Sequence, residues 1–177
     1  MLGLAKGSVA LCSHSEDWHR LFSEEAFRIR KASAHHFLAI EHIGSTAICG
    51  LVAKPIVDIA AAVNDVALEV GCIAKLEELG YEYRGESGIR ARAYFVKGQP
   101  RTHHLHVLNV ASQEWRNHIT FRDYLRDHRD VVEEYASLKR VLAAQYNDDR
   151  EAYTEGKGAF IRDVIRRAAR AARANTY

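Results

Sequence analysis

A glycine–serine turn and one isolated carboxylate are the residues in this chain that first suggest chemistry. Gly44-Ser45 follows an apolar stretch, where glycine permits close backbone approach, and free N–H groups and the Ser45 hydroxyl can face a phosphate. Asp58 interrupts the next apolar stretch, PIVDIAAAV, and a carboxylate is almost never fully buried without a partner. These residues predict a phosphate-and-metal site. The structural alternatives are an ordinary turn at Gly44-Ser45 and an ion pair between Asp58 and Lys54.

Three histidines lie close together in the segment THHLHV. Side chains alternate between the faces of a strand, so His104 and His106 are expected on one face, where they could share a metal or act as a base. Imidazole suits zinc, manganese or iron better than magnesium. The alternative for this pair is hydrogen bonding within the sheet, and for His103 alone that structural reading is favoured.

Three cations fall in register with apolar residues of predicted helices, so each should point into or close to the core: Arg122, Lys139 and Lys157. A single basic side chain can bury its stem and keep its charge in water. Three that converge would repel one another and lose hydration, which an anionic ligand such as a phosphate chain would offset. Structural ion pairs are the alternative, and the candidate carboxylates are Asp123, Glu133, Glu134 and Asp163.

Other features exclude some protein classes. A Walker A phosphate loop is missing, because Gly44 has no glycine five residues later and Glu151 stands where Gly156-Lys157 would need the first glycine of that motif. P-loop kinases and GTPases are therefore excluded. The three cysteines match no paired metal-ligand spacing and are expected to stay reduced.

The distribution of apolar and basic residues bears on location and partners. No segment approaches the roughly 20 apolar residues that span a bilayer, so we expect a cytoplasmic protein with no membrane partner. The C-terminal stretch RDVIRRAARAARANTY is strongly basic and could contact nucleic acid or an acidic partner. An Ala/Arg pattern is more typical of a solvated final helix, so nucleic acid is not expected as a partner.

The pattern of apolar residues predicts one domain over residues 1–177, of the α/β (α+β) class, with a mixed sheet, an N-terminal helix and a helical C-terminal third. The N-terminal helix should start at Ser15 as its N-cap. The expected strands are 37–44, 55–63, 81–85, 91–98 and 103–110, and the expected later helices are 67–80, 112–128, 130–146 and 148–172.

These residues resemble the GrpB family. The resemblance rests on IEHIGSTAICGLVAKPIVDI, THHLHV, Trp115 followed by FRDYLR, EYASLK, and a final Tyr153–Lys157 run with FI, in the same order from about Trp18 to about Ala168. It implies a nucleotidyltransferase fold, similar in its core to DNA polymerase beta and the aminoglycoside nucleotidyltransferases. In some proteins the family's domain is fused to a dephospho-coenzyme A kinase domain, which associates it with coenzyme A.

The resemblance also implies roles for individual residues. In the wider superfamily a Gly-Ser turn holds the triphosphate, and an Asp-x-Asp/Glu pair on the next strand, with a third carboxylate on a later strand, serves two divalent ions and the acceptor hydroxyl. Gly44-Ser45 matches the turn, and Asp58 matches the first carboxylate. The second position is Ala60, the later strand offers His104 and His106 instead of an acid, and Cys49 stands where the family usually has proline.

The expected function is transfer of a nucleotidyl group from a nucleoside triphosphate to a small acceptor, with Mg²⁺ or Mn²⁺ as the divalent metal. Asp58 and His106 are the expected metal ligands, and His104 or His106 the expected base. The expected phosphate-binding residues are Gly44, Ser45, Lys54, Arg122, Lys139 and Lys157. One alternative is a catalytically degenerate module that binds a nucleotide or a coenzyme A-related phosphate. The other is a metal-dependent hydrolase that uses His42, His104, His106 and Asp58.

Overall fold

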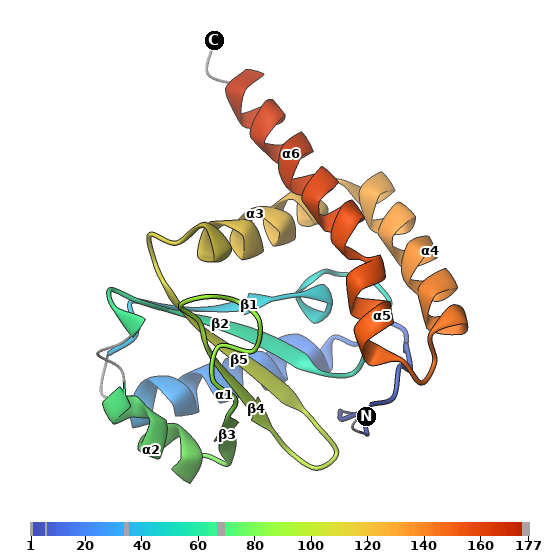
Figure 1. The fold of residues 1–177 in the computed structure, drawn as a ribbon. Coiled ribbons are helices and arrows are strands. Elements are labelled where there is room, and N and C mark those ends of the chain that lie inside the picture. Colours follow the sequence, from blue (N-terminus) through green and yellow to red (C-terminus); the bar gives the residue numbers. More distant parts are fainter. Residues whose placement is uncertain (1, 6, 34–35, 67–69, 175–177) are drawn as a thin grey trace.

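A five-stranded mixed sheet separates two groups of helices, as Figure 1 shows for the computed structural model, which describes residues 2–5, 7–33, 36–66 and 70–174. The elements are α1 (Asp17–Ala32), β1 (Ala39–Ile43), the 3-10 turn η1 (Ser45–Ala47), β2 (Val57–Val63), α2 (Val70–Glu78), β3 (Tyr81–Tyr83), β4 (Ala93–Lys97), β5 (His103–Asn109), α3 (Gln113–Asp127), α4 (Arg129–Gln145), α5 (Arg150–Gly156) and α6 (Gly158–Ala174). The predicted α/β class and mixed sheet are confirmed.

The strand order is β1-β2-β5-β4-β3, with β2 and β5 parallel and the other neighbouring pairs antiparallel. In the parallel pair, Asp58 lies opposite His104, and Ala60 lies opposite His106. Paired residues share a face of the sheet, so these four side chains lie on the same side. This register brings residues of two distant sequence motifs together.

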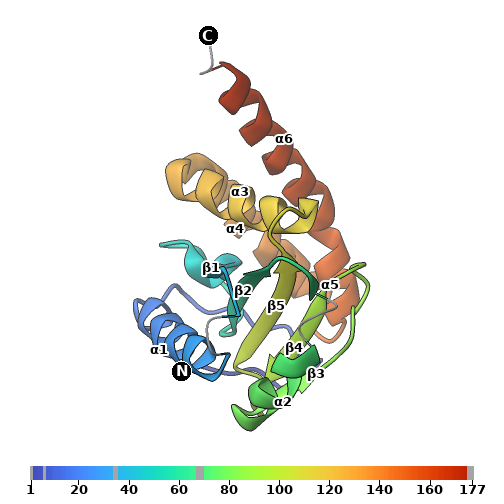
Figure 2. The same ribbon diagram turned by 90° about the vertical axis from the view of Figure 1, so that its left-hand side faces the viewer.

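Two apolar clusters cover the two faces of the sheet. One joins α1 and α2 to the sheet through residues such as Ile29, Ile59 and Leu105, each fully buried. The other joins α3, α4 and α6 to the loop after η1 through residues such as Leu51, Tyr135 and Val164. Figure 2 shows the same division, with α1 and α2 on one side of the sheet and α3 to α6 on the other.

The predicted final helix, 148–172, is wrong as one continuous element. It divides into α5 and α6, and Lys157 lies at the junction. A Cβ atom on Gly156 would lie 2.6 Å from Leu142 Cδ2, so glycine lets the end of α5 approach α4 closely. The interruption lies at Lys157, a position that helical periodicity alone does not reveal.

The start of α3 agrees with the prediction, the N-cap of α5 lies one residue after the predicted opening at 148, and two other helix starts differ. Ser112 caps α3 by accepting from the Trp115 N–H, and Asp149 caps α5. The Ser15 cap is wrong, because α1 begins at Asp17 after Glu16 and shows no side-chain capping bond. Helix α4 begins at Arg129, one residue before its predicted start, and the predicted start of α2 at 67–69 lies outside the described residues.

None of the helices within the described ranges is both long enough and apolar enough to span a bilayer.

Candidate active site

A cavity of about 730 Å³ lies over the face of the sheet that carries Asp58 and His104. Strands, the η1 turn and the C-terminal helices all contribute to its lining. The lining includes Ser45, Asp58, Tyr94, His104, His106, Tyr153 and the cations Lys54, Arg84, Arg92, Arg101, Lys139, Arg150 and Lys157. A concave site with several convergent polar groups is the usual form of a small-molecule site.

Gly44 brings the η1 turn against Asp58. Its φ of +68° lies in the region that favours glycine, and a Cβ atom there would lie 2.5 Å from Asp58 Oδ2. The turn that starts with Ser45 therefore sits directly beside the carboxylate. The sequence predicted this proximity of Gly44, Ser45 and Asp58, and the geometry shows that steric contact alone requires glycine here.

Asp58 is paired with His104. The His104 Nδ1 and Asp58 Oδ1 atoms lie 2.7 Å apart, whereas no ion pair joins Asp58 to Lys54 among the described residues. Burial by itself would raise the pKa of Asp58, but the hydrogen bond from His104 and the nearby charges, including Lys54, lower it below its ordinary value. Asp58 is therefore an ionised carboxylate near neutral pH.

The second nitrogen of His104 faces an arginine. His104 Nε2 lies 3.4 Å from Arg150 Nη2, and a guanidinium group can only donate. The network therefore assigns the proton of a neutral His104 to Nδ1, which donates to Asp58, and leaves Nε2 as an acceptor. Asp58 thereby orients the imidazole of His104, a residue of the cavity lining, with the lone pair of Nε2 toward Arg150.

His106 has a different environment from the one expected of a metal ligand. Its Nδ1 lies 3.2 Å from Arg92 Nη1, and its ring packs 5.1 Å from the Tyr94 ring. Burial lowers the pKa of His106 well below its ordinary value, so the ring is neutral and accepts from Arg92. A cation beside Nδ1 disfavours a metal at that atom. His103 points to the opposite face, where its Nδ1 contacts Thr102 Oγ1 at 2.9 Å.

Lys54, Lys139 and Lys157 form a lysine group beside Ser45 and Asp58. Lys54 and Lys157 lie 5.1 and 4.4 Å from the centre of the Tyr153 ring. Lys139 lies 5.2 Å from the Tyr135 ring and donates to the carbonyl of Val52. No member of the group forms an ion pair with a carboxylate in the part of the chain that the structure describes.

Burial and mutual repulsion act on the lysine group together. Burial, followed by the charge of Lys157, lowers the pKa of Lys139 to about 7. Burial, followed by the charge of Arg150, lowers the pKa of Lys54 to about 8, and burial with the charge of Lys54 does the same for Lys157. An anion between these ammonium groups would remove the repulsion.

The expected convergence of three helical cations is wrong for Arg122. Its Nη1 lies 2.6 Å from Glu41 Oε2 and its Nε lies 2.7 Å from Asp123 Oδ1, and it does not line the cavity. The structural ion pair to Asp123, one of the alternatives for these cations, applies at this position. We therefore leave Arg122 out of the candidate site.

A histidine-based metal centre is not assembled at Asp58. His42 lies opposite Ile59 in the β1–β2 register, so it points away from Asp58, and its ring stacks on Phe22 at 4.7 Å. Burial lowers the pKa of His42 to about 3. No group of three closely spaced metal-ligand atoms within the described ranges includes Asp58, His104 or His106. The hydrolase alternative therefore loses its ligand set.

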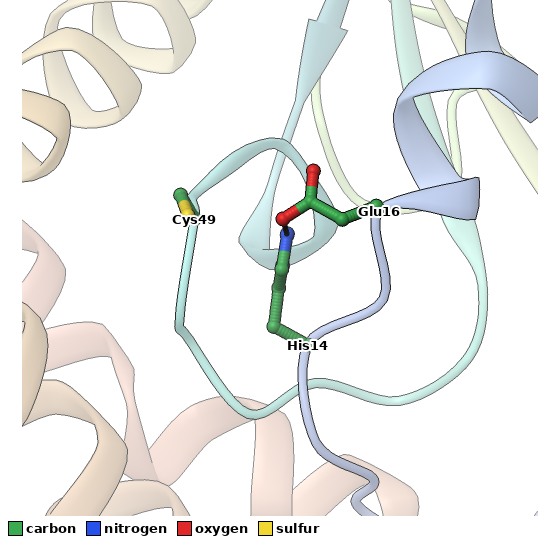
Figure 3. A group of neighbouring side chains, drawn as sticks. All are labelled: His14, Glu16 and Cys49. Carbon is green, nitrogen blue, oxygen red and sulfur yellow. Dashed lines mark ion pairs between the residues drawn. The ribbon is translucent and has the colours of Figure 1, made fainter.

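The group that does meet this spacing lies elsewhere. Ligand atoms of His14, Glu16 and Cys49 lie within 4.8 Å of one another, and Figure 3 shows that they come from the segment before α1 and the loop after η1. Glu16 and Cys49 are exposed, and His14 Nε2 lies 3.7 Å from Glu16 Oε1. This surface group contributes nothing to the cavity lining.

The arginines that line the cavity were missed by the sequence analysis. Arg150 directly follows the N-cap Asp149, Arg101 lies in the β4–β5 turn, and Arg92 precedes β4. None of them interrupts an apolar pattern, which was the signal that pointed to Asp58 and Lys139. A charged residue in an expected turn is ordinary in sequence, so only the packing shows where these side chains point.

Comparison with known proteins identifies relatives along most of the chain. The family model described as GrpB protein matches residues 8–167. UPF0157 protein PA4798 from Pseudomonas aeruginosa is 43% identical over 161 residues, which cover 88% of this chain and 66% of that protein. UPF0157 protein YqkA from Bacillus subtilis is 37% identical over 166 residues, which cover 93% of this chain. The chain spans 48% of the length of YqkA.

Similar structures and one longer relative complete the comparison. The crystal structure of conserved protein GrpB from Enterococcus faecalis has a TM-score of 0.84 at 35% identity, covering 90% of this chain and 96% of that one. The Cid1 poly(U) polymerase structure with Mg 3'-dATP bound has a TM-score of 0.53 at 10% identity, covering 81% and 49%, and supports a nucleotidyltransferase-like fold. A Mycolicibacterium paratuberculosis protein named dephospho-CoA kinase is 25% identical, covering 93% of this chain and 47% of that protein.

Proposed function

The chain belongs to the GrpB family, and we propose that its cavity binds a metal-bound nucleoside triphosphate and transfers the nucleotidyl group to a small acceptor. The observation that carries this proposal is the lysine group beside an ionised Asp58, because the buried Lys139 and the half-buried Lys54 and Lys157 lack carboxylate partners among the described residues. A phosphate chain supplies the missing negative charge. We assign Ser45, which starts η1 and lines the cavity, as a hydroxyl donor to the same phosphates.

The residues fit one divalent ion. Asp58 Oδ1 is engaged by His104, which leaves Oδ2 beside Gly44 as the protein oxygen for a metal. Mg²⁺ is commonly held by one or two carboxylates together with substrate phosphates and water. Asp58 would hold Mg²⁺ or Mn²⁺, and the ion would neutralise part of the phosphate charge. We leave His106 out of the set of metal ligands because Arg92 faces its Nδ1 atom.

His104 is the proposed general base. The acceptor hydroxyl oxygen attacks the α-phosphorus, the bond from that phosphorus to the bridging oxygen breaks, and pyrophosphate leaves. The hydroxyl proton passes to His104 Nε2, which Asp58 orients through Nδ1. In the ligand-free state Nε2 faces Arg150, so this step requires Arg150 to turn from the imidazole to an anionic group of a ligand.

The proposal is tested with ATP labelled at the α-phosphate, Mg²⁺ or Mn²⁺, and a pool of small metabolites. We expect a labelled product and released pyrophosphate with the wild-type chain, and a loss of about 100-fold or more in rate with Asp58→Asn. Ser45→Ala should weaken nucleotide binding about tenfold. Arg140→Gln, an exposed change on α4 away from the cavity lining, is the control. Absence of nucleotide binding by the wild type would overturn the proposal.

A second candidate is nucleotide or coenzyme A-related phosphate binding without transfer, as an accessory module. It is favoured by Ala60, which is fully buried at the position of a second carboxylate, and by His104 at the position opposite Asp58. In a site for two metal ions, the ions stabilise the attacking and the leaving oxygen of the reaction. When the second carboxylate is missing, one of the two ions is lost. Tight binding that Asp58→Asn weakens, with no labelled product from any metabolite fraction, would select this candidate over transfer.

A further inference from the structure

The cavity carries more positive charge than one metal-bound triphosphate neutralises. Seven cationic side chains line it, against the two carboxylates of Asp58 and Glu151. A nucleoside triphosphate with one divalent ion brings roughly two net negative charges at neutral pH. Several cations would therefore remain without a counter-charge after such a ligand binds.

Six of the seven cations divide into two groups with different surroundings, and Arg92 belongs to neither. The lysine group lies around the rings of Tyr135 and Tyr153, next to Ser45. The second, which we call the arginine group, consists of Arg84, Arg101 and Arg150. Arg101 and Arg150 lie close enough to Tyr94 of β4 for their charges to act on its hydroxyl. The Asp58–His104 pair touches the arginine group, because Arg150 reaches His104 Nε2.

The arginine group is poorly neutralised by the protein itself. Arg101 and Arg150 form no ion pair within the described ranges, and Arg84 pairs only with the exposed Glu82, at 2.6 Å. Burial, followed by the charges of Arg150 and Arg84, lowers the pKa of Arg101. Three guanidinium groups that repel one another at the wall of a cavity are an arrangement that an oxyanion stabilises, because planar forks bind phosphate or carboxylate with paired hydrogen bonds.

Arg92 shows what a structural arginine in the same cavity looks like. Its Nε donates to the carbonyl of Glu86, its Nη2 donates to that of Ser87, and its Nη1 faces His106. It also packs over Tyr94 at 4.7 Å. These contacts occupy each nitrogen of Arg92, whereas Arg101 has no side-chain hydrogen bond to another described residue in the structure.

We infer that the arginine group is a second anion subsite, which binds a phosphate or carboxylate group of the acceptor while the lysine group holds the triphosphate. The inference rests on the proposed function, since it assigns the acceptor a chemical class: a small molecule with both a hydroxyl and an oxyanion. Binding of that oxyanion draws Arg150 from His104 Nε2 and leaves this nitrogen free to take the hydroxyl proton. Acceptor binding and exposure of the base are thereby coupled.

The test titrates inorganic phosphate into the wild-type chain saturated with Mg²⁺ and α,β-methylene-ATP, with binding followed by calorimetry. We expect phosphate to bind in the presence of the nucleotide analogue. Arg101→Gln should weaken phosphate about tenfold while changing the affinity for the analogue less than threefold, and Lys157→Gln should do the reverse. Arg140→Gln should change neither. Acetate titrated at the same ionic strength separates a carboxylate-bearing from a phosphate-bearing acceptor.

Each other outcome has a defined meaning. If the analogue binds and phosphate competes with it, the cavity has one anion site, and the second subsite is overturned while the proposed function stands. If the analogue does not bind to the wild type, the proposed function and the inference fall together. Thermal melting checks the variants, and Arg101→Gln is expected to fold because the backbone of residue 101, not its side chain, makes the bridge to Leu4.

Discussion

On the face of the sheet that α1 covers, Lys97 reaches the buried carboxylate of Glu25 at 2.6 Å. On the opposite face, Lys139 and Lys157 are buried or half-buried and have no carboxylate partner in the described part of the chain. The first arrangement is complete within the protein, and its loss should appear as lost stability. The second is complete only with an anion, and its loss should appear as lost binding.

The largest expected effect comes from removing the ion pair between Lys97 and Glu25. Lys97→Gln leaves the Glu25 carboxylate, which is 3% exposed, with the more distant Arg28, at 3.7 Å, as its one ion-pair partner among the described residues. We expect a loss of about 2–4 kcal/mol in the free energy of unfolding, measured by urea denaturation. Nucleotide affinity of the folded variant should stay within threefold of wild type. A selective loss of affinity would contradict the division between the two faces.

Gly44→Ala tests the contact that joins the turn to the carboxylate. Because φ is +68° and the new Cβ would lie 2.5 Å from Asp58 Oδ2, we expect a loss of about 2–3 kcal/mol in stability together with weakened nucleotide binding. Gly85→Ala is the matched control, since Gly85 has a φ of +63° and no atom within 4 Å of the added Cβ. Equal binding losses in both variants would show that strain, and not Asp58, is responsible.

Lys157→Gln is the matching substitution on the cavity face of the sheet, where Lys157 has no carboxylate partner among the described residues. We expect nucleotide binding to weaken by about 10- to 100-fold, as for the loss of one charge-assisted hydrogen bond. Stability without ligand should fall by less than about 0.5 kcal/mol or rise, because repulsion with Lys54 is relieved. Isothermal calorimetry and urea denaturation of the same preparation measure both quantities. A large loss of stability with unchanged affinity would assign Lys157 to packing.

The smallest effect is that of pH. The pKa of Lys139 is lowered to about 7 and those of Lys54 and Lys157 to about 8, so these groups lose protons as pH rises from 7 to 9. Nucleotide affinity should fall about three- to tenfold over this range. Without ligand the sign is opposite: the unfolded lysines bind more protons above pH 7, so the free energy of unfolding should rise with pH. Affinity that is flat with pH would contradict a role for these lysines.

The sequence predicted the parts of the site that disturb an apolar pattern. Asp58 and Lys139 are polar residues within apolar repeats, and both line the cavity. Arg122 shows the same pattern but is neutralised by Glu41, which is 81 residues away in sequence. Periodicity gives the direction in which a side chain points along one element. It does not give the partner that another element brings to it.

Strands and helices with long apolar patterns were predictable from the sequence. Features that involve contacts between separate elements were less predictable. The order of strands and helices along the chain agrees with the prediction, but the pattern did not reveal the break at Lys157, beside the close approach of Gly156 to Leu142. Likewise, the pairing of Asp58 with His104 depends on the parallel register of β2 and β5. The sequence identified both side chains as functional candidates without showing that they form one hydrogen-bonded unit.

The parallel pairing of β2 with β5 also has a consequence for folding. Asp58 and His104 are 46 residues apart in sequence, and the intervening chain contains α2, β3 and β4. Contacts between residues so far apart in sequence are slow to form, because the chain loses conformational entropy on closing the loop before the contact contributes favourable free energy. Partly folded chains, in which only local helices and the β4–β5 hairpin exist, therefore have no ligand site, and a ligand can stabilise only molecules that have completed the sheet.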